Sequence, residues 1–279
     1  MIPCLFVSDL HGSAGRAARL FGAIVGERPR AVFLGGDLLA HGRGGDFLRD
    51  VLLPGLARAR DAMGTAYPEV FAILGNDDPR AAAEPLMLEG ADQGLWQYVH
   101  GRRATLGRFT VLGYNCIPPS PFRLKDWERY DVSRFVDPGC LAPDEGLHTG
   151  APEPARTIAQ DLARIAGGSD LTHAVCLFHV PPYDTALDRA ALDGRSVDHA
   201  PLDVHIGSIA VRRFMEVHGP WLGLHGHVHE SARLTGSWMD QLGRTVLLGA
   251  AHDGPELALL RFDLERPDWA TRVLVAASG

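Results

Sequence analysis

Carboxylate, amide and imidazole side chains follow several short apolar segments of this chain, at the points where the segments end. They are Asp9, His11, Asp37, Asn76, His179, His227 and His229. Side chains of these types coordinate borderline divalent metals such as Zn, Mn or Fe when they converge. Because ligands of open α/β sheets gather at the carboxyl ends of the strands, we expect these residues to lie close together. The pattern therefore predicts a metal centre.

Most of these motifs are weak evidence when each is taken alone. An aspartate and a histidine two residues apart, such as Asp9 and His11, are often a solvated strand end. Asp37 follows a glycine pair, and glycine permits a sharp turn after a strand. Asp78 can instead be the N-cap of a helix that begins near residue 79. His179 ends a single apolar segment, where a histidine is often structural.

The strongest single motif places His225, His227 and His229 around one glycine. Histidine clusters are a recognised metal signature, although a solvated surface is the alternative. His225 comes directly before the pair, so we expect it to orient the pair or to take part in catalysis. The structural explanations given above for single motifs would have to hold at every strand end at once. The motifs together therefore favour a metal site.

The elements that must position these residues can be read from hydrophobic spacing. Helices are expected over residues 15–27, 47–63, from about 79, 157–165 and 207–217. Strands are expected over 2–8, 31–34, 69–74, 98–99, 104–106, 109–112, 173–178, 221–224, 245–248, 256–263 and 271–275, with 98–112 antiparallel. Alternating strands and helices in the first half indicate a largely parallel sheet with helices on its faces. We expect one domain over residues 1–279 with two sheets packed between helices, and long loops at about 115–154 and 180–206.

Composition narrows the class of protein. The 279 residues are 46% hydrophobic, which is enough to form a core. The net charge of −7 lacks the positive excess that is typical of nucleic-acid-binding proteins. No apolar run approaches the ~20 residues that cross a bilayer, and the start lacks the features of a signal peptide. The four cysteines are scattered singly, which argues against disulfides. We expect a cytoplasmic protein without a membrane or nucleic-acid partner; a homo-oligomer is possible.

Taken in order, the motifs resemble those of the calcineurin-like metallophosphoesterase superfamily, which read D-x-H, G-D, G-N-H-[DE], H and G-H-x-H. Here they stand as Asp9-x-His11, Gly36-Asp37, Gly75-Asn76-Asp77-Asp78, His179 and Gly226-His227-x-His229. The blocks extend from residue 9 to residue 229, which is most of the chain. The resemblance implies an α/β fold of four layers, an αββα sandwich in which two mixed β-sheets are flanked by helices.

The resemblance also implies a dinuclear site for two divalent metal ions, with Mn, Fe or Zn as candidates. It assigns one ion to Asp9, His11 and His229, the other to Asn76, His179 and His227, and the bridge to Asp37. Two such ions, about 3.5–4 Å apart, share a hydroxide that attacks phosphorus in line, and they offset the charge of the phosphoryl oxygens. The implied enzyme is a metal-dependent phosphoesterase acting on a small phosphorylated substrate.

Asp77 departs from the family pattern, which has at this position a histidine that contacts phosphate and can protonate the leaving group. An aspartate beside two cations favours its anion, which is a poor acid and repels phosphate. Three hypotheses follow. The substrate has a good leaving group; or another histidine replaces the acid, among His41, His199, His205 and His225; or Asp77 binds polar groups of the substrate or a further cation. Without the usual acid a phosphodiesterase is favoured, and Asp77, Asp37 and His225 are the candidate catalytic residues.

The long loops are expected to select the substrate. Arg123 and Lys125, the only lysine, lie near aromatic residues and could hold a nucleotide or another phosphorylated ring. The alternative is packing of the loop with salt bridges. In the second loop His199 and His205 are candidates for lining the pocket. His41 is either a substrate contact beside the metals or a solvated loop histidine.

A different class of function is the main alternative. A non-catalytic binding or scaffold protein can use the same fold, like the retromer subunit that resembles phosphoesterases. Such a protein should have lost ligands, whereas this chain keeps all seven. A phosphomonoesterase or a nuclease of the same family is a further alternative, and the acidic charge without basic tracts counts against the nuclease.

Overall fold

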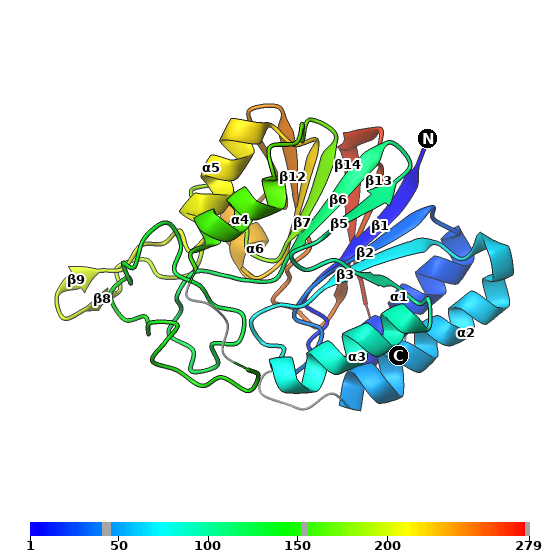
Figure 1. Ribbon diagram of the computed structural model, residues 1–279, viewed down its shortest axis with the longest axis horizontal. Coiled ribbons are helices and arrows are strands. Elements are labelled where there is room, and N and C mark those ends of the chain that lie inside the picture. Colours follow the sequence, from blue (N-terminus) through cyan, green and yellow to red (C-terminus); the bar gives the residue numbers. More distant parts are fainter. Residues whose placement is uncertain (41–45, 152–155, 277–279) are drawn as a thin grey trace.

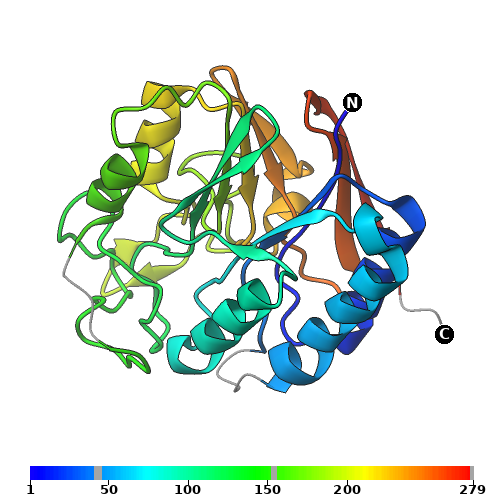
Figure 2. The same ribbon diagram turned by 45° about the vertical axis from the view of Figure 1, so that its right-hand side comes forward.

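Two β-sheets packed face to face form the centre of the molecule, and helices cover their outer faces (Figure 1). The computed structural model describes residues 1–40, 46–151 and 156–276. One side carries α1 (Ala14–Glu27), α2 (Leu53–Met63) and α3 (Arg80–Asp92), and the other carries α4 (Ile158–Ala166) and α5 (Ile209–His218). Figure 2 shows the sheets between these two groups of helices. The expected four-layer α/β fold is confirmed.

The first sheet has the strand order β14-β13-β1-β2-β3-β4. Its parallel part is β1 (Pro3–Val7), β2 (Ala31–Gly35), β3 (Glu69–Ile73) and β4 (Gln97–Tyr98), and its antiparallel part adds β13 (Leu257–Asp263) and β14 (Arg266–Val275). The expectation that residues 98–99 pair antiparallel is wrong, because Tyr98 pairs in parallel with Ala72 of β3. Helix α3 crosses from β3 to β4, and such a crossover joins parallel strands.

The second sheet has the order β11-β12-β10-β7-β6-β5 and is also mixed. Its strands are β5 (Arg103–Leu106), β6 (Phe109–Tyr114), β7 (Ala174–Phe178), β10 (Leu222–His225), β11 (Met239–Leu242) and β12 (Thr245–Gly249). The strands β6, β7, β10 and β12 are parallel, whereas β5 and β11 pair antiparallel at the two edges. Strand β11 was not expected from the sequence, because its residues show neither an apolar run nor clear alternation.

Alternate residues of each strand belong to two different parts of the core. Phe6, Phe33 and Val175 lie in the cluster between the two sheets. Their strand neighbours, such as Leu5 and Cys176, belong to the cluster that includes the helices. Strands buried on both faces read as continuous apolar runs, which is why the sequence marks them clearly.

Three of the helices begin at a short polar side chain that caps them. Ser13 caps α1, Ser208 caps α5, and Thr157 forms a capping box with Gln160 at the start of α4. The segment expected as one helix over 47–63 contains a π-helical turn, η1 (Leu48–Leu52), before α2, and a short 3-10 turn, η2 (Gly64–Ala66), follows. A further short helix, α6 (Ser231–Thr235), follows the histidine motif.

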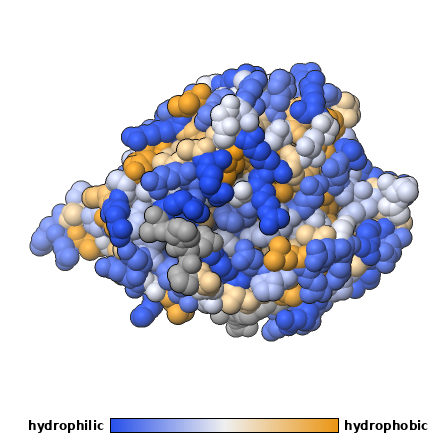
Figure 3. Space-filling view, in the orientation of Figure 1, coloured by the Kyte–Doolittle hydropathy of each residue, from blue (hydrophilic) through white to orange (hydrophobic). Residues whose placement is uncertain are grey.

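The two long connections differ in structure. Between residues 115 and 151 the chain forms only isolated bridges, such as Leu124 with Leu147. The second connection contains a hairpin of β8 (Ser196–Val197) and β9 (Ala200–Pro201), which projects to the left in Figure 1. On the face shown in Figure 3, hydrophilic residues predominate and apolar ones are scattered. No helix in the described part of the chain has the length and apolar character needed to cross a membrane.

Candidate metal centre at the carboxyl ends of the strands

The metal-type residues follow strands of both sheets. Asp9 and His11 come after β1, Asp37 after β2, Asn76 after β3, His179 after β7, and His227 and His229 after β10. Backbone hydrogen bonds join the loops, since Asp9 N–H donates to Gly36 O (2.9 Å) and Gly226 N–H donates to His179 O (2.9 Å). The structure thus brings together loops that lie far apart in the sequence.

The backbone at these loops is strained. Asp9, His11, Asp37 and His227 have φ angles of 57°, 46°, 48° and 73°, in the left-handed region that residues other than glycine rarely adopt. Such conformations cost about 1–3 kcal/mol each and cluster at functional sites, where the surrounding structure enforces them. Four candidate ligands with this geometry therefore point to a site that is built for a function.

One group of ligand atoms comes from both sheets. The ligand atoms of Asp9, His11, Asp37 and His229 lie within 4.8 Å of one another. His11 Nε2 is 2.9 Å from His229 Nε2, and His229 Nε2 is 3.1 Å from Asp9 Oδ1. Two imidazoles and two carboxylates therefore converge on one point, which is the donor set expected for a borderline divalent ion.

A second group shares Asp37 with the first and includes His179 and His227. His179 is fully buried, its Nε2 lies 3.3 Å from Asp37 Oδ2, and its Nδ1 hydrogen bonds with Gly35 O at 2.8 Å. Asn76 Oδ1 is 3.2 Å from the same Nε2 atom. A ring nitrogen that donates to a backbone carbonyl leaves the other nitrogen free for a metal, so His179 is oriented as metal-binding histidines usually are.

Two glycines make room for these ligands. A Cβ atom on Gly75 would lie 2.2 Å from Asp37 Oδ1 and 2.6 Å from His179 Nε2. A Cβ atom on Gly226 would lie 2.5 Å from Asp9 Oδ2. These glycines precede the Asn76 and His227 motifs, and they allow backbone to approach the ligands closely.

Charge compensation within the cluster shifts several pKa values. Burial alone would lower the pKa of His179, but the neighbouring Asp37 and Asp9 carboxylates raise it to about 10. Burial also opposes the charge of His229, yet its hydrogen bond with Asp9 raises its pKa to about 9. Burial, together with the charge of His179, lowers the pKa of His227 to about 3. Imidazolium groups therefore neutralise the carboxylates where divalent cations would otherwise do so.

The residues present fit divalent cations. Asp9 Oδ2 is buried and has no hydrogen-bond partner within the described ranges. An unpartnered buried carboxylate oxygen is costly, and a cation between the converging donors would satisfy it. Nitrogen and oxygen donors without a thiolate suit Mn, Fe or Zn.

Asp77 and Asp78 follow Asn76 and have different surroundings. Asp77 lies beside the ligands, with its Oδ2 3.6 Å from His11 Nδ1. Asp78 is fully buried, and its carboxylate accepts hydrogen bonds from the backbone N–H groups of Leu38, Leu39 and Gly75. Asp78 therefore ties the loop after β3 to the loop after β2. The alternative in which Asp78 caps α3 is wrong, because Pro79 occupies the N-cap without a side-chain bond.

His225 and Arg16 donate hydrogen bonds to backbone carbonyls of the loops that carry the candidate ligands. His225 is fully buried, and its Nδ1 donates to Phe178 O (2.9 Å) and Val180 O (3.0 Å), on either side of His179. This geometry positions a backbone loop and leaves the ring inaccessible to a substrate. Arg16 donates to Asp9 O (2.5 Å) and also to Gly254 O. Sequence reasoning missed Arg16, because its spacing is that of an ordinary helix residue.

The candidate substrate residues do not gather at one place. Lys125 is fully buried, and its ammonium donates to Glu128 Oε2 (2.6 Å) and Ser120 O (2.8 Å), so it is not available to a substrate phosphate. Arg123 is exposed, and His199 is exposed in the turn between β8 and β9. His205 pairs with the buried Asp188 at 2.8 Å. His41 lies outside the described residues.

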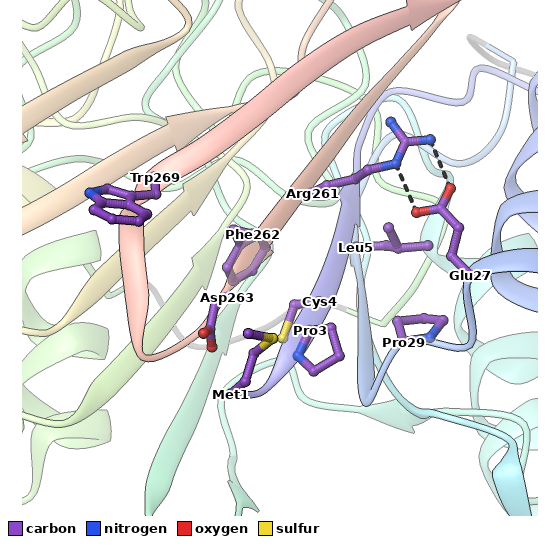
Figure 4. A pocket seen from close by; sticks show the side chains of 10 residues that line it. All are labelled: Met1, Pro3, Cys4, Leu5, Glu27, Pro29, Arg261, Phe262, Asp263 and Trp269. Carbon is purple, nitrogen blue, oxygen red and sulfur yellow. Dashed lines mark hydrogen bonds and ion pairs between the residues drawn. The ribbon is translucent and has the colours of Figure 1, made fainter.

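A separate pocket of about 290 Å³ lies at the amino ends of β1 and β2 (Figure 4). Its lining includes Pro3, Cys4 and Trp269, and a bidentate ion pair joins Arg261 to Glu27. It therefore lies at the opposite ends of the strands from Asp9 and the other candidate ligands.

The chain is similar to known proteins in its sequence pattern and in its fold. A family profile described as calcineurin-like phosphoesterase matches residues 2–231. No curated protein matches the chain. The protein TT1561 of Thermus thermophilus has a similar fold, with a TM-score of 0.60 at 16% identity over 98% of this chain and 99% of that chain. A dimetal phosphatase from Danio rerio has a TM-score of 0.53 at 14% identity, over 93% and 91% of the two chains. Since the profile covers most of the sequence, the chain belongs to the calcineurin-like phosphoesterase family.

Proposed function

We propose that this protein is a phosphoesterase that uses two divalent metal ions and favours phosphodiesters. The observation that carries the proposal is the sharing of Asp37 by two groups of ligand atoms. When bound, a pair of divalent ions supplies an activated water for attack on phosphorus and neutralises charge on the phosphoryl oxygens. In our proposal the ions are held by Asp9, His11 and His229 on one side, and by Asn76, His179 and His227 on the other, with Asp37 between them.

The residues around the ligands fix the two halves of the site. Asp78 bonds to backbone of both the Asp37 and the Asn76 loops, and His225 bonds to backbone on both sides of His179. Rigid positioning of this kind lowers the entropic cost of assembling the reacting groups. Asn76 adds a neutral oxygen, which limits negative charge where an anionic substrate must bind.

The preference for a diester follows from charge. Asp9, Asp37 and Asp77 together place three carboxylates close to the ligand cluster. Two divalent ions would exceed this negative charge by little, so a singly charged phosphodiester is accommodated better than a doubly charged monoester. Asp77 also occupies the position where the family pattern has a histidine acid. A substrate with a good leaving group, which needs no protonation, is therefore favoured.

The experiment measures metal content and hydrolysis on the same protein. After chelation and reloading with Mn²⁺, we expect about two ions per chain and faster turnover of bis-p-nitrophenyl phosphate than of p-nitrophenyl phosphate. His179→Asn should lose bound metal and activity, whereas His173→Asn, at an exposed histidine, should lose neither. A metal-replete protein that is inert toward monoesters, diesters and pyrophosphate would contradict the proposal and support a non-catalytic protein.

A further inference from the structure

Asp77 contacts three of the candidate metal ligands at once. Its Oδ1 accepts a hydrogen bond from Asn76 Nδ2 at 3.0 Å. Its Oδ2 lies 3.6 Å from His11 Nδ1, which is within ion-pair range and longer than a hydrogen bond. Its backbone N–H donates to Asp37 Oδ1 at 2.8 Å. One residue therefore meets a ligand of each proposed ion and the ligand that they share.

The orientation of the His11 ring gives its contact with Asp77 a specific meaning. His11 Nε2 faces the ligand cluster, 2.9 Å from His229 Nε2 and 3.9 Å from Asp9 Oδ1. The other ring nitrogen, Nδ1, faces Asp77. In metal-binding histidines the nitrogen away from the ion commonly donates to a carboxylate, which fixes the tautomer and the ring. A proton held on Nδ1 leaves the Nε2 lone pair directed at the cluster.

The orientation of the Asn76 amide depends on its hydrogen bond with Asp77. An asparagine can present either its oxygen or its NH₂ group to a neighbour, and only the oxygen can bind a cation. Because Asn76 Nδ2 donates to Asp77 Oδ1, Asn76 Oδ1 is directed to His179 Nε2, at 3.2 Å. Asp77 thus turns the correct atom toward the second group of ligands.

We propose that Asp77 is a positioning residue that holds His11 and Asn76 in the orientations needed to bind the two metal ions. It acts through these ligands rather than as an acid or a substrate contact. Its side chain is only 13% exposed, which agrees with a role directed inward. The inference rests on the proposed two-ion function and explains why an aspartate can serve where the family pattern has a histidine.

The test compares Mn²⁺ affinity in wild-type protein, Asp77→Ala and Asp77→Asn. Loss of such an outer carboxylate typically weakens metal binding about 10–100-fold, and we expect this for Asp77→Ala. Asp77→Asn keeps an oxygen for Asn76 but loses the charge that favours a proton on His11 Nδ1, so a smaller loss is expected. At saturating Mn²⁺ both variants should regain kcat to within about threefold, with the pH profile unchanged, since an acid would contribute about 10²–10⁴-fold. Asp193→Asn, at an exposed carboxylate paired with Arg189, is the control that loses the same charge.

Four outcomes are informative. Unchanged Mn²⁺ affinity in Asp77→Ala would overturn the positioning role. A large fall in kcat at saturating Mn²⁺, with loss of the alkaline limb of the pH profile, would overturn it in favour of an acid. If the wild-type protein binds two ions but hydrolyses no ester, only the proposed enzymatic function fails, because the affinity comparison remains valid. A wild-type protein that binds no Mn²⁺ overturns both.

Discussion

A substitution at Gly75 would perturb the candidate metal centre without replacing any of its ligands. Its backbone does not have a positive φ angle, so an alanine is allowed there by conformation. The added Cβ atom would nevertheless lie 2.2 Å from Asp37 Oδ1 and 2.6 Å from His179 Nε2. Gly75→Ala therefore tests whether the space between these two side chains matters.

The expected size of the effect follows from the overlap. Since carbon and oxygen atoms in contact stay about 3.2–3.5 Å apart, Asp37 or the backbone must move by about 1 Å. Metal sites tolerate errors in ligand distance of only about 0.2 Å. A displacement of about 1 Å commonly costs about 10²-fold in rate, and overpacking costs about 1–3 kcal/mol of folding free energy.

The assay measures Mn²⁺ affinity by calorimetry and hydrolysis of bis-p-nitrophenyl phosphate for Gly75→Ala. Gly26→Ala is the matched control, because a Cβ atom at this position in α1 meets nothing within 4 Å. It should keep full metal affinity and gain up to about 1 kcal/mol of stability. Wild-type affinity and kcat in Gly75→Ala would refute the argument that these ligands require a glycine beside them.

Three further predictions concern protons and buried charge. Because His179 and His229 have pKa values raised to about 10 and 9, Mn²⁺ must displace their protons; its affinity should therefore rise with pH up to about 9–10, with buffer-dependent proton release in calorimetry. Burial lowers the pKa of His100 to about 3, so the unfolded state binds more protons between about pH 6.5 and 3 and stability falls there as pH falls. His100→Gln should reduce this loss by up to about 1.4 kcal/mol per pH unit in urea unfolding; an unchanged pH dependence would contradict it. Lys125→Met leaves the buried Glu128 unpaired and should cost about 3–5 kcal/mol, whereas adding Glu128→Gln should recover part of the loss, measured by thermal unfolding. If the single variant is as stable as wild type, the ion pair has no such role.

Much of the fold could be predicted because buried strands and capped helices leave local signals. The apolar runs that became β1, β2, β3 and β7 are buried on both faces and are therefore continuous in sequence. Strand direction at β4 was not predicted correctly, because two residues carry no information about their pairing partner. The edge strand β11 was missed for a related reason, since its residues are only partly buried or exposed.

The supporting residues of the site were harder to predict than its candidate ligands. Lys125 is basic and lies near aromatic residues, a pattern that suits a phosphate contact as well as a buried ion pair. Its burial beside Glu128 depends on how the loop folds back, which spacing does not encode. Asp78 could cap a helix or bond to a distant loop, and only the proximity of the Leu38 and Leu39 N–H groups selects the second.

The sequence alone determined the residue types, their order at successive strand ends and the family to which these motifs belong. Those features are local, because a strand, a glycine turn and a metal-type side chain lie within a few residues of one another. Only the tertiary structure decided that ligand atoms from two sheets converge with Asp37 in common, and that Asp77 lies against both His11 and Asn76. Such contacts depend on distances between segments far apart in the chain, and packing of the whole molecule sets these distances.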